Sequence, residues 1–174
     1  MILYILFPTK HEHSQMISDY IEYITLKRKE LGGHAICPFA KKFLDKTEII
    51  ESEDMEEDAI KCLESEERPM LWLIYGCPKK FNEDWLTSLC EKHKDKAAEK
   101  DLWMIWDHPN QVNKIGSVET NNKEYGVILI QPLKELNKYS DKLKKSNYYD
   151  YWDENYLQEV LEEDYKEVFN KKPQ

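Results

Sequence analysis

Met70-Leu71-Trp72-Leu73-Ile74-Tyr75 is an unbroken apolar run, closed by Gly76-Cys77-Pro78. A run of this length without polar alternation is typical of a strand in the middle of a sheet that is covered on both faces. Leu102-Trp103-Met104-Ile105-Trp106 repeats the pattern and ends at Asp107-His108-Pro109. The sequence therefore predicts a sheet built around these two strands.

Three other short apolar runs extend the predicted sheet: Ile2–Phe7, Thr47–Ile50 and Tyr125–Ile130. Strands alternate with helices from residue 46 to residue 106, which favours right-handed crossovers and parallel pairing. Only a loop precedes the last strand, so it can join antiparallel. We predict an α/β three-layer sandwich with a mainly parallel sheet of four or five strands. A ferredoxin-like α+β arrangement is the alternative.

The helices are predicted from apolar residues that recur every three or four positions and from capping residues at their ends. The first helix is capped by Ser14 and ended by Gly32-Gly33, and a short second helix runs from Cys37-Pro38 to Leu44. An acidic third helix has the apolar stripe Met55, Ala59, Cys62 and Leu63, and a fourth, capped by Asn82, has the apolar stripe Leu86, Leu89, Cys90, His93 and Ala97. Two more helices are predicted over Leu133–Lys144 and Asp153–Phe169. Residues 1–174 are expected to form a single domain. Within it, 146–174 is a helical extension anchored by the aromatic residues at 148–152.

The charge distribution limits the classes of partner. A net charge of −9 disfavours nucleic-acid binding, which needs clustered Lys and Arg. Residues 51–68 carry nine acids against Lys61 and Arg68, and residues 150–167 carry eight against Lys166. Either these acidic helices are solvated on one face and pair with a helix face of lysines, or they bind a basic protein partner. The lysines are Lys134, Lys138, Lys142 and Lys145.

The four cysteines form no Cys-x-x-Cys pair, which favours free thiols in a reducing cytoplasm. No apolar run approaches the length of a membrane span, so no membrane association is expected. The sequence contains no phosphate-binding glycine loop and no hydrolase or metalloprotease motif. Nucleotide hydrolysis and serine hydrolysis therefore have no support.

Ligands of open α/β sheets bind at the carboxyl ends of the strands, so Cys77 and His108 would share one rim if their strands are neighbours. Cys37 is predicted at the start of a helix, where backbone N–H groups stabilise a thiolate. We expect Cys37 as nucleophile or metal ligand, His108 as base or ligand, His34 as an auxiliary group and Lys41 as an anion anchor. The alternative is that Cys37 and His108 are structural.

A divalent metal held by Cys37, His34 and His108 is the cofactor that these residue types suggest. Cys-Pro dipeptides also bind haem iron, but a two-residue motif gives haem little support. Asp107 could orient His108 as its carboxylate partner. As sequence neighbours, however, the two side chains are expected to point apart.

The segment Ile36-Cys37-Pro38-Phe39-Ala40-Lys41, together with His108-Pro109, resembles a family of uncharacterised bacterial proteins with CPFAK and His-Pro signatures. Gly116 and the stretch from Thr120 to Tyr125 also follow that pattern. The resemblance implies that Cys37 and His108 belong to one site, and adds Asn121 and Tyr125 as neighbours. It implies no reaction.

Two functions follow as expectations. The first is a small cytoplasmic protein with a Cys/His site at the carboxyl edge of the sheet, either a thiol- or metal-dependent enzyme or a protein that binds a small-molecule ligand. The alternative is a non-catalytic acidic protein that binds a basic protein partner.

Overall fold

The computed structural model describes residues 10–154, except for the side chains of residues 10–14 and 16. The predicted strand Ile2–Phe7 and nearly all of the predicted helix Asp153–Phe169 lie outside these residues. The elements, with 3₁₀ helices written η, are α1 (Lys10–Thr25), η1 (Lys29–Leu31), α2 (Ala40–Phe43), η2 (Leu44–Lys46), β1 (Thr47–Glu51), α3 (Met55–Glu64), β2 (Leu71–Gly76), α4 (Glu83–Glu99), β3 (Leu102–Asp107), β4 (Lys114–Ile115), β5 (Val118–Glu119), β6 (Gly126–Pro132), α5 (Leu133–Lys144) and η3 (Tyr148–Tyr151).

Among residues 10–154, the main sheet has four strands in the order β1-β2-β6-β3. β1 and β2 are parallel, whereas β6 pairs antiparallel with both of its neighbours. The prediction of a mainly parallel sheet is therefore wrong. β6 follows the small β4–β5 hairpin instead of a crossover helix, so it runs opposite to β2 and β3 and separates them.

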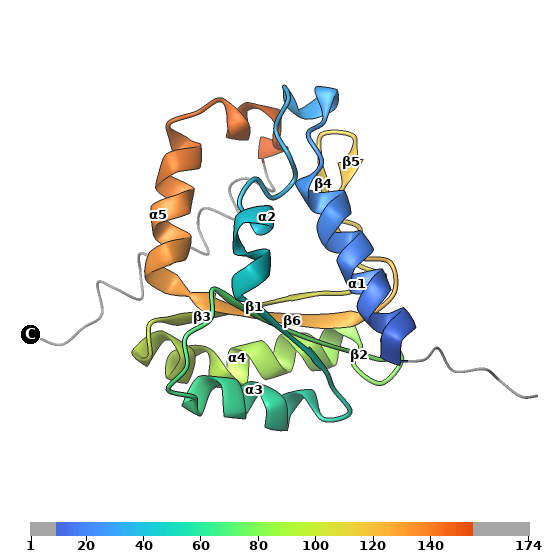
Figure 1. The fold of residues 1–174 in the computed structure, drawn as a ribbon, viewed down its shortest axis with the longest axis vertical. Coiled ribbons are helices and arrows are strands. Elements are labelled where there is room, and N and C mark those ends of the chain that lie inside the picture. Colours follow the sequence, from blue (N-terminus) through green and yellow to red (C-terminus); the bar gives the residue numbers. More distant parts are fainter. Residues whose placement is uncertain (1–9, 155–174) are drawn as a thin grey trace, which may run out of the picture.

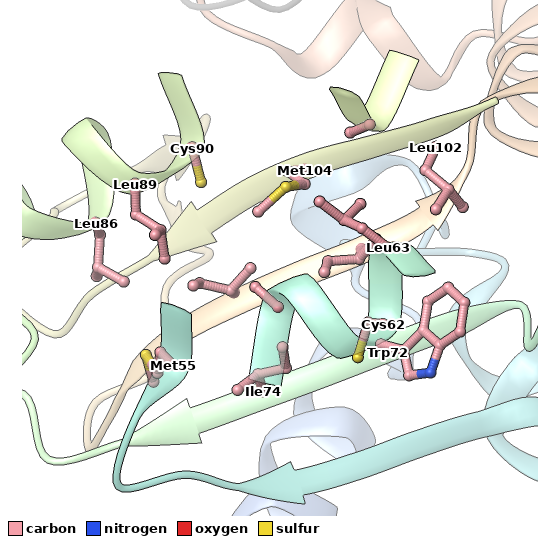
Figure 2. Close-up of a cluster of buried hydrophobic side chains, with 14 of the residues drawn as sticks. Met55, Cys62, Leu63, Trp72, Ile74, Leu86, Leu89, Cys90, Leu102 and Met104 are labelled. Atoms are coloured by element: carbon pink, nitrogen blue, oxygen red, sulfur yellow. The ribbon is translucent and has the colours of Figure 1, made fainter. Parts of the chain in front are cut away.

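Helices cover both faces of this sheet, unlike a two-layer ferredoxin-like arrangement (Figure 1). α3 and α4 lie on one face, and α1, α2 and α5 lie on the other. Between the sheet and the α3–α4 layer is the largest cluster of buried apolar side chains, to which α3 contributes Met55 and Leu63 and β2 contributes Trp72 and Ile74 (Figure 2). A smaller cluster joins Ile17 of α1 to the opposite face.

α3 and α4 each begin directly after a residue whose side chain caps the first turn, Asp54 and Asn82 respectively. The Asp54 side chain accepts a hydrogen bond from the Glu57 N–H at 3.0 Å, and Asn82 accepts one from the Trp85 N–H at 3.0 Å. These bonds satisfy backbone donors that the first turn of a helix leaves unpaired. The predicted Asn82 cap and the predicted buried stripes of both helices are confirmed.

The first helix differs from its prediction at both ends. It already includes Lys10, so Ser14 lies inside it and is not its cap, and it ends at Thr25 instead of continuing to Leu31. Arg28 is extended, and the Arg28 N–H donates to the His34 carbonyl, which closes a local loop. Gly32, at φ 59°, ends the η1 turn in the left-handed region that glycine adopts at low cost.

No helix within residues 10–154 combines the length and the apolar character that crossing a bilayer requires.

Candidate functional site

The carboxyl ends of β2 and β3 lie at the same edge of the sheet, but β6 separates them. Gly76 of β2 pairs with Gly126, and Asp107 of β3 pairs with Val127. β2 and β3 are therefore not neighbours, which was the condition for Cys77 and His108 to share one rim. Their following loops nevertheless meet, because His108 reaches across to the turn after β2.

Both ring nitrogens of the His108 imidazole have partners. Its side chain is almost fully buried; Nδ1 accepts the Asn110 N–H at 3.2 Å, and Nε2 donates to the Pro78 carbonyl at 3.1 Å. These bonds assign the Nε2–H tautomer, since a backbone N–H needs an acceptor and a carbonyl needs a donor. The Glu83 carboxylate lies 3.6 Å from Nδ1. His108 thus ties the loop after β3 to the turn after β2, and has no unoccupied nitrogen to act as a base.

The Asp107 carboxylate points away from the imidazole. One oxygen accepts the His108 backbone N–H, and the other accepts both the backbone and side-chain N–H groups of Asn122, each at 2.8 Å. Tyr20 of α1 approaches the same oxygen at 3.4 Å. Burial raises the pKa of Asp107 above its ordinary value, in spite of these donors. Asp107 therefore organises a loop and does not orient His108.

Asn121 and Tyr125 lie beside this network. The buried Asn121 amide donates to the carbonyls of His108 and Pro109. The Tyr125 ring meets the Tyr75 ring edge-on, with centroids 5.0 Å apart, and burial raises the pKa of both phenols. These residues hold the edge of the sheet together through amide and ring contacts.

Two residues of this network were missed by the sequence analysis. Asn122 accepts the N–H groups of Glu124 and Tyr125, which is the geometry of an Asx turn. The pair Asn121-Asn122 before a strand is a sequence signal for such a turn. Tyr20 fitted the apolar period of the first helix, which gave no sign that its hydroxyl donates to the Thr120 carbonyl at 2.9 Å.

Cys37 lies in a turn, and not at a helix start. α2 begins three residues later, at Ala40. The Cys37 N–H donates to the Ile24 carbonyl at the end of α1. The residue is partly exposed, but its thiol is enclosed: burial raises the pKa of Cys37, and the backbone N–H groups of Phe39 and Ala40 offset this only in part. This direction is opposite to the low pKa that a thiolate at a helix start would have.

His34 and Lys41 lie in other surroundings. The His34 Nε2 is 2.8 Å from the Asn147 side-chain oxygen, and its ring meets Tyr148 edge-on at 5.6 Å. The Tyr148 hydroxyl donates to the Ile36 carbonyl, so η3 is attached to the Cys37 turn. Lys41 is exposed on α2.

The structure does not assemble the predicted Cys/His site. Cys37 is bound to the end of α1, His34 to η3, and His108 to the turn after β2. Across the part of the chain that the structure describes, no three His, Cys, Asp or Glu side chains are close enough to bind a metal ion. The predicted metal site of Cys37, His34 and His108 is therefore not formed.

The remaining thiols divide into core and surface. Burial raises the pKa of Cys62 and of Cys90 to about 12, as expected for thiols packed among apolar side chains. Cys77 is exposed. His93, four residues along the α4 stripe from Leu89, is bound to the Glu56 carboxylate at 3.0 Å. Cys62, Cys90 and His93 therefore have structural environments, whereas Cys77 lies on the surface.

No family model matches this sequence, and neither a curated protein nor a solved structure does so.

Proposed function

We propose that this chain is a non-catalytic cytoplasmic protein that binds a basic protein partner through its acidic surface, defined here as the exposed carboxylates of residues 51–68. The observation that carries the proposal is that these carboxylates outnumber the cations beside them. The polar groups at the carboxyl edge, by contrast, are engaged in contacts that hold its loops.

The charge balance of the acidic surface follows from its ion pairs. Nine acids lie in residues 51–68 with Lys61 and Arg68. Lysines of α4 and of the turn before it pair with three of these acids: Lys80 with Glu53, Lys92 with Glu56, and Lys96 with Glu64. Nine acids, seven of them exposed, therefore lie among five bases. The lysines of α5 that were expected as partners pair with Glu135 and Asp101 or lie over Tyr139 instead.

Several of these carboxylates are well exposed. The Glu53 side chain is 99% exposed and that of Glu57 is 64% exposed. Charges in such positions contribute little to folding, because water and salt screen them. They can instead attract a cationic partner and accelerate its association.

The test uses a fluorescent ten-residue oligolysine as the probe and measures its affinity by anisotropy. In the full chain, Glu53→Lys, Glu66→Lys and Glu67→Lys together reverse three exposed charges of the acidic surface. We expect the Kd to rise about tenfold or more, and the wild-type affinity to fall steeply with salt.

The matched control reverses three exposed acids elsewhere, Glu22→Lys, Glu30→Lys and Glu154→Lys, with the same change in net charge. It should change the Kd about twofold or less, since long-range charge alone is screened. Equal losses in the two triple variants would show that the probe senses net charge and that no particular surface binds it.

A small-molecule site at the carboxyl edge is the second candidate. It is favoured by the Tyr75–Tyr125 pair beside Glu51, where burial and then the Glu51 charge raise the pKa of Tyr75 to about 12. Two phenols and a carboxylate would suit a polar ligand. Thermal shifts against a metabolite panel test it: a stabilising compound whose effect is lost in Tyr125→Phe and kept in Tyr149→Phe, a half-buried tyrosine of η3, would support such a site.

A further inference from the structure

The outer edge of β1 is an open strand edge. The order β1-β2-β6-β3 makes β1 a terminal strand, with no neighbour on its outer side among residues 10–154. Alternate N–H and C=O groups of an edge strand point away from the sheet and can pair with another strand. β1 has no proline and no lysine, two residues that commonly protect such edges.

A second copy of the chain is disfavoured at β1. Glu48 and Glu51 are both exposed on this five-residue strand. Two β1 edges paired antiparallel about Ile49 would place the two Glu48 side chains at diagonal positions on one face, and like charges in neighbouring strands destabilise the pair. The same carboxylates would attract Lys or Arg on an added strand.

Apolar anchors lie beside these charges. Ile49 is 37% exposed and Leu44, just before β1, is 43% exposed, although both are large hydrophobic residues. Ile49 and Glu51 project to one face of the sheet, while Glu48 and Ile50 project to the other, where Glu48 accepts the Trp72 indole N–H at 2.9 Å. Each face of the β1 edge thus offers an apolar side chain and a carboxylate.

We propose that β1 accepts an extended segment of the basic partner, which adds to the sheet as a fifth strand with alternating apolar and basic residues. This inference rests on the proposed function and specifies how the partner binds. Main-chain hydrogen bonds along β1 would provide affinity. The basic side chains would lie on the face of Ile49 and Glu51, with their methylene stems along Ile49 and their charges beside Glu51, and the apolar side chains would lie on the face of Ile50.

The experiment compares three labelled heptapeptides with the full-length protein: alternating lysine–valine, the same peptide with its central valine replaced by proline, and alternating glutamate–valine. Only the first should bind, because proline removes a main-chain donor and glutamate opposes Glu48 and Glu51. Bound peptide should slow amide hydrogen exchange in Thr47–Glu51.

Two variants localise the binding. Ile49→Lys places a cation on the edge and should raise the Kd of the lysine–valine peptide about tenfold or more. Val112→Lys is the matched control: it converts another exposed apolar residue, 61% exposed in the loop after β3, and should leave the Kd unchanged. Leu44→Lys outside the strand serves as a second variant if Ile49→Lys does not fold by circular dichroism.

Equal binding of the proline peptide, or unchanged exchange in Thr47–Glu51, would overturn strand addition while leaving the proposed function in place. Equal binding of the glutamate peptide would overturn the requirement for a basic segment. Absence of binding by every cationic probe, oligolysine included, would overturn both the inference and the proposed function.

Discussion

At the level of single residues, Asp107 and His108 show how polar groups at the end of a strand become structural. Buried polar atoms lose their water and must find partners within the protein. The Asp107 carboxylate finds them in Asn122, and the His108 imidazole finds them in Pro78 and Asn110. Both side chains stabilise loops that the sheet cannot hold by itself.

Asp107→Asn tests this role through stability. Asn has one acceptor oxygen and one N–H donor where Asp107 has two oxygens that accept N–H groups, so the variant should lower the free energy of unfolding by about 1–3 kcal/mol. Because burial raises the folded pKa of Asp107 above the ordinary value of 3.8, the wild type loses stability as pH rises through the interval between these values. The penalty of the variant should therefore be larger at pH 4 than at pH 7.

Urea unfolding at both pH values measures this difference. Asp95→Asn, at an exposed position of α4, is the control and should show only a small penalty at either pH. A penalty for Asp107→Asn that grows from pH 4 to pH 7 would contradict the assigned direction of the pKa shift.

The Cys37 thiol should react slowly with iodoacetamide. Alkylation requires the thiolate, and burial raises the pKa of Cys37. At pH 7 its rate should be about tenfold or more below that of the exposed Cys77, and should still be rising at pH 9. Mass spectrometry of wild type and Cys77→Ser separates the two thiols. A rate that levels off near pH 7 would restore the reactive-thiolate hypothesis.

At the level of elements, local capping explains where α3 and α4 begin, whereas tertiary contacts explain where α1 ends. The apolar positions that predicted one helix up to Leu31 are Ile17, Tyr20, Ile21, Ile24 and Leu31, and the turn of that period after Ile24 falls on Lys27 and Arg28. The loop closed by Arg28 and His34 interrupts the helix after Thr25. This loop sets the position of the Cys37 turn against Ile24.

Asn82→Ala should remove the cap of α4 and lower the free energy of unfolding by about 1 kcal/mol. The Trp85 N–H would lose its side-chain acceptor. Ser88→Ala, at an exposed position in the middle of the same helix, is the control and should be nearly neutral. Urea unfolding of both variants checks the difference, and equal stabilities would mean that the cap contributes nothing.

At the level of the whole molecule, the two faces of the sheet differ in the size of the apolar cluster that packs against them. The cluster under α3 and α4 includes side chains from both helices and from three strands (Figure 2). The cluster under α1 is smaller and includes two tyrosines, Tyr75 and Tyr125. Stability should therefore depend mainly on the α3–α4 side, and the carboxyl edge should depend on the polar network of Asp107.

Leu63→Ala should lower the free energy of unfolding by about 2–5 kcal/mol, because the lost methyl groups leave a cavity in a close-packed region. Leu63 is fully buried, whereas Leu26 is half exposed. Leu26→Ala, as the matched control, should change stability by about 0.5 kcal/mol or less. A small effect of Leu63→Ala in thermal or urea unfolding would contradict the assignment of the main core.

Much of the fold was predictable because its signals are local. The runs at 70–75 and 102–106 became β2 and β3, and the stripe of Met55, Ala59, Cys62 and Leu63 is the buried face of α3. The antiparallel direction allowed for the last strand is also found. Its central place in the sheet was not predicted, because the strand itself contains no signal for which neighbours it joins.

The candidate site was less predictable for the same reason. Cys37, His34 and His108 are residue types that suit catalysis and metal binding, yet their surroundings are set by segments distant in sequence, such as Ile24, Asn147 and Pro78. Residue type indicates what a side chain is able to do. Its burial and hydrogen bonds, which decide what it does, depend on the neighbours that folding brings to it.

By itself, then, the sequence determined which segments are strands and helices, where α4 is capped, and that the region around α3 is acidic, because periodicity, capping and charge act over a few residues. Only the tertiary structure decided that β6 separates β2 from β3, that the Cys37 thiol is enclosed, and that β1 is an edge strand among residues 10–154. Those outcomes depend on strand pairing and burial between segments that are distant in sequence. The free energy of such contacts cannot be read from a short stretch of residues.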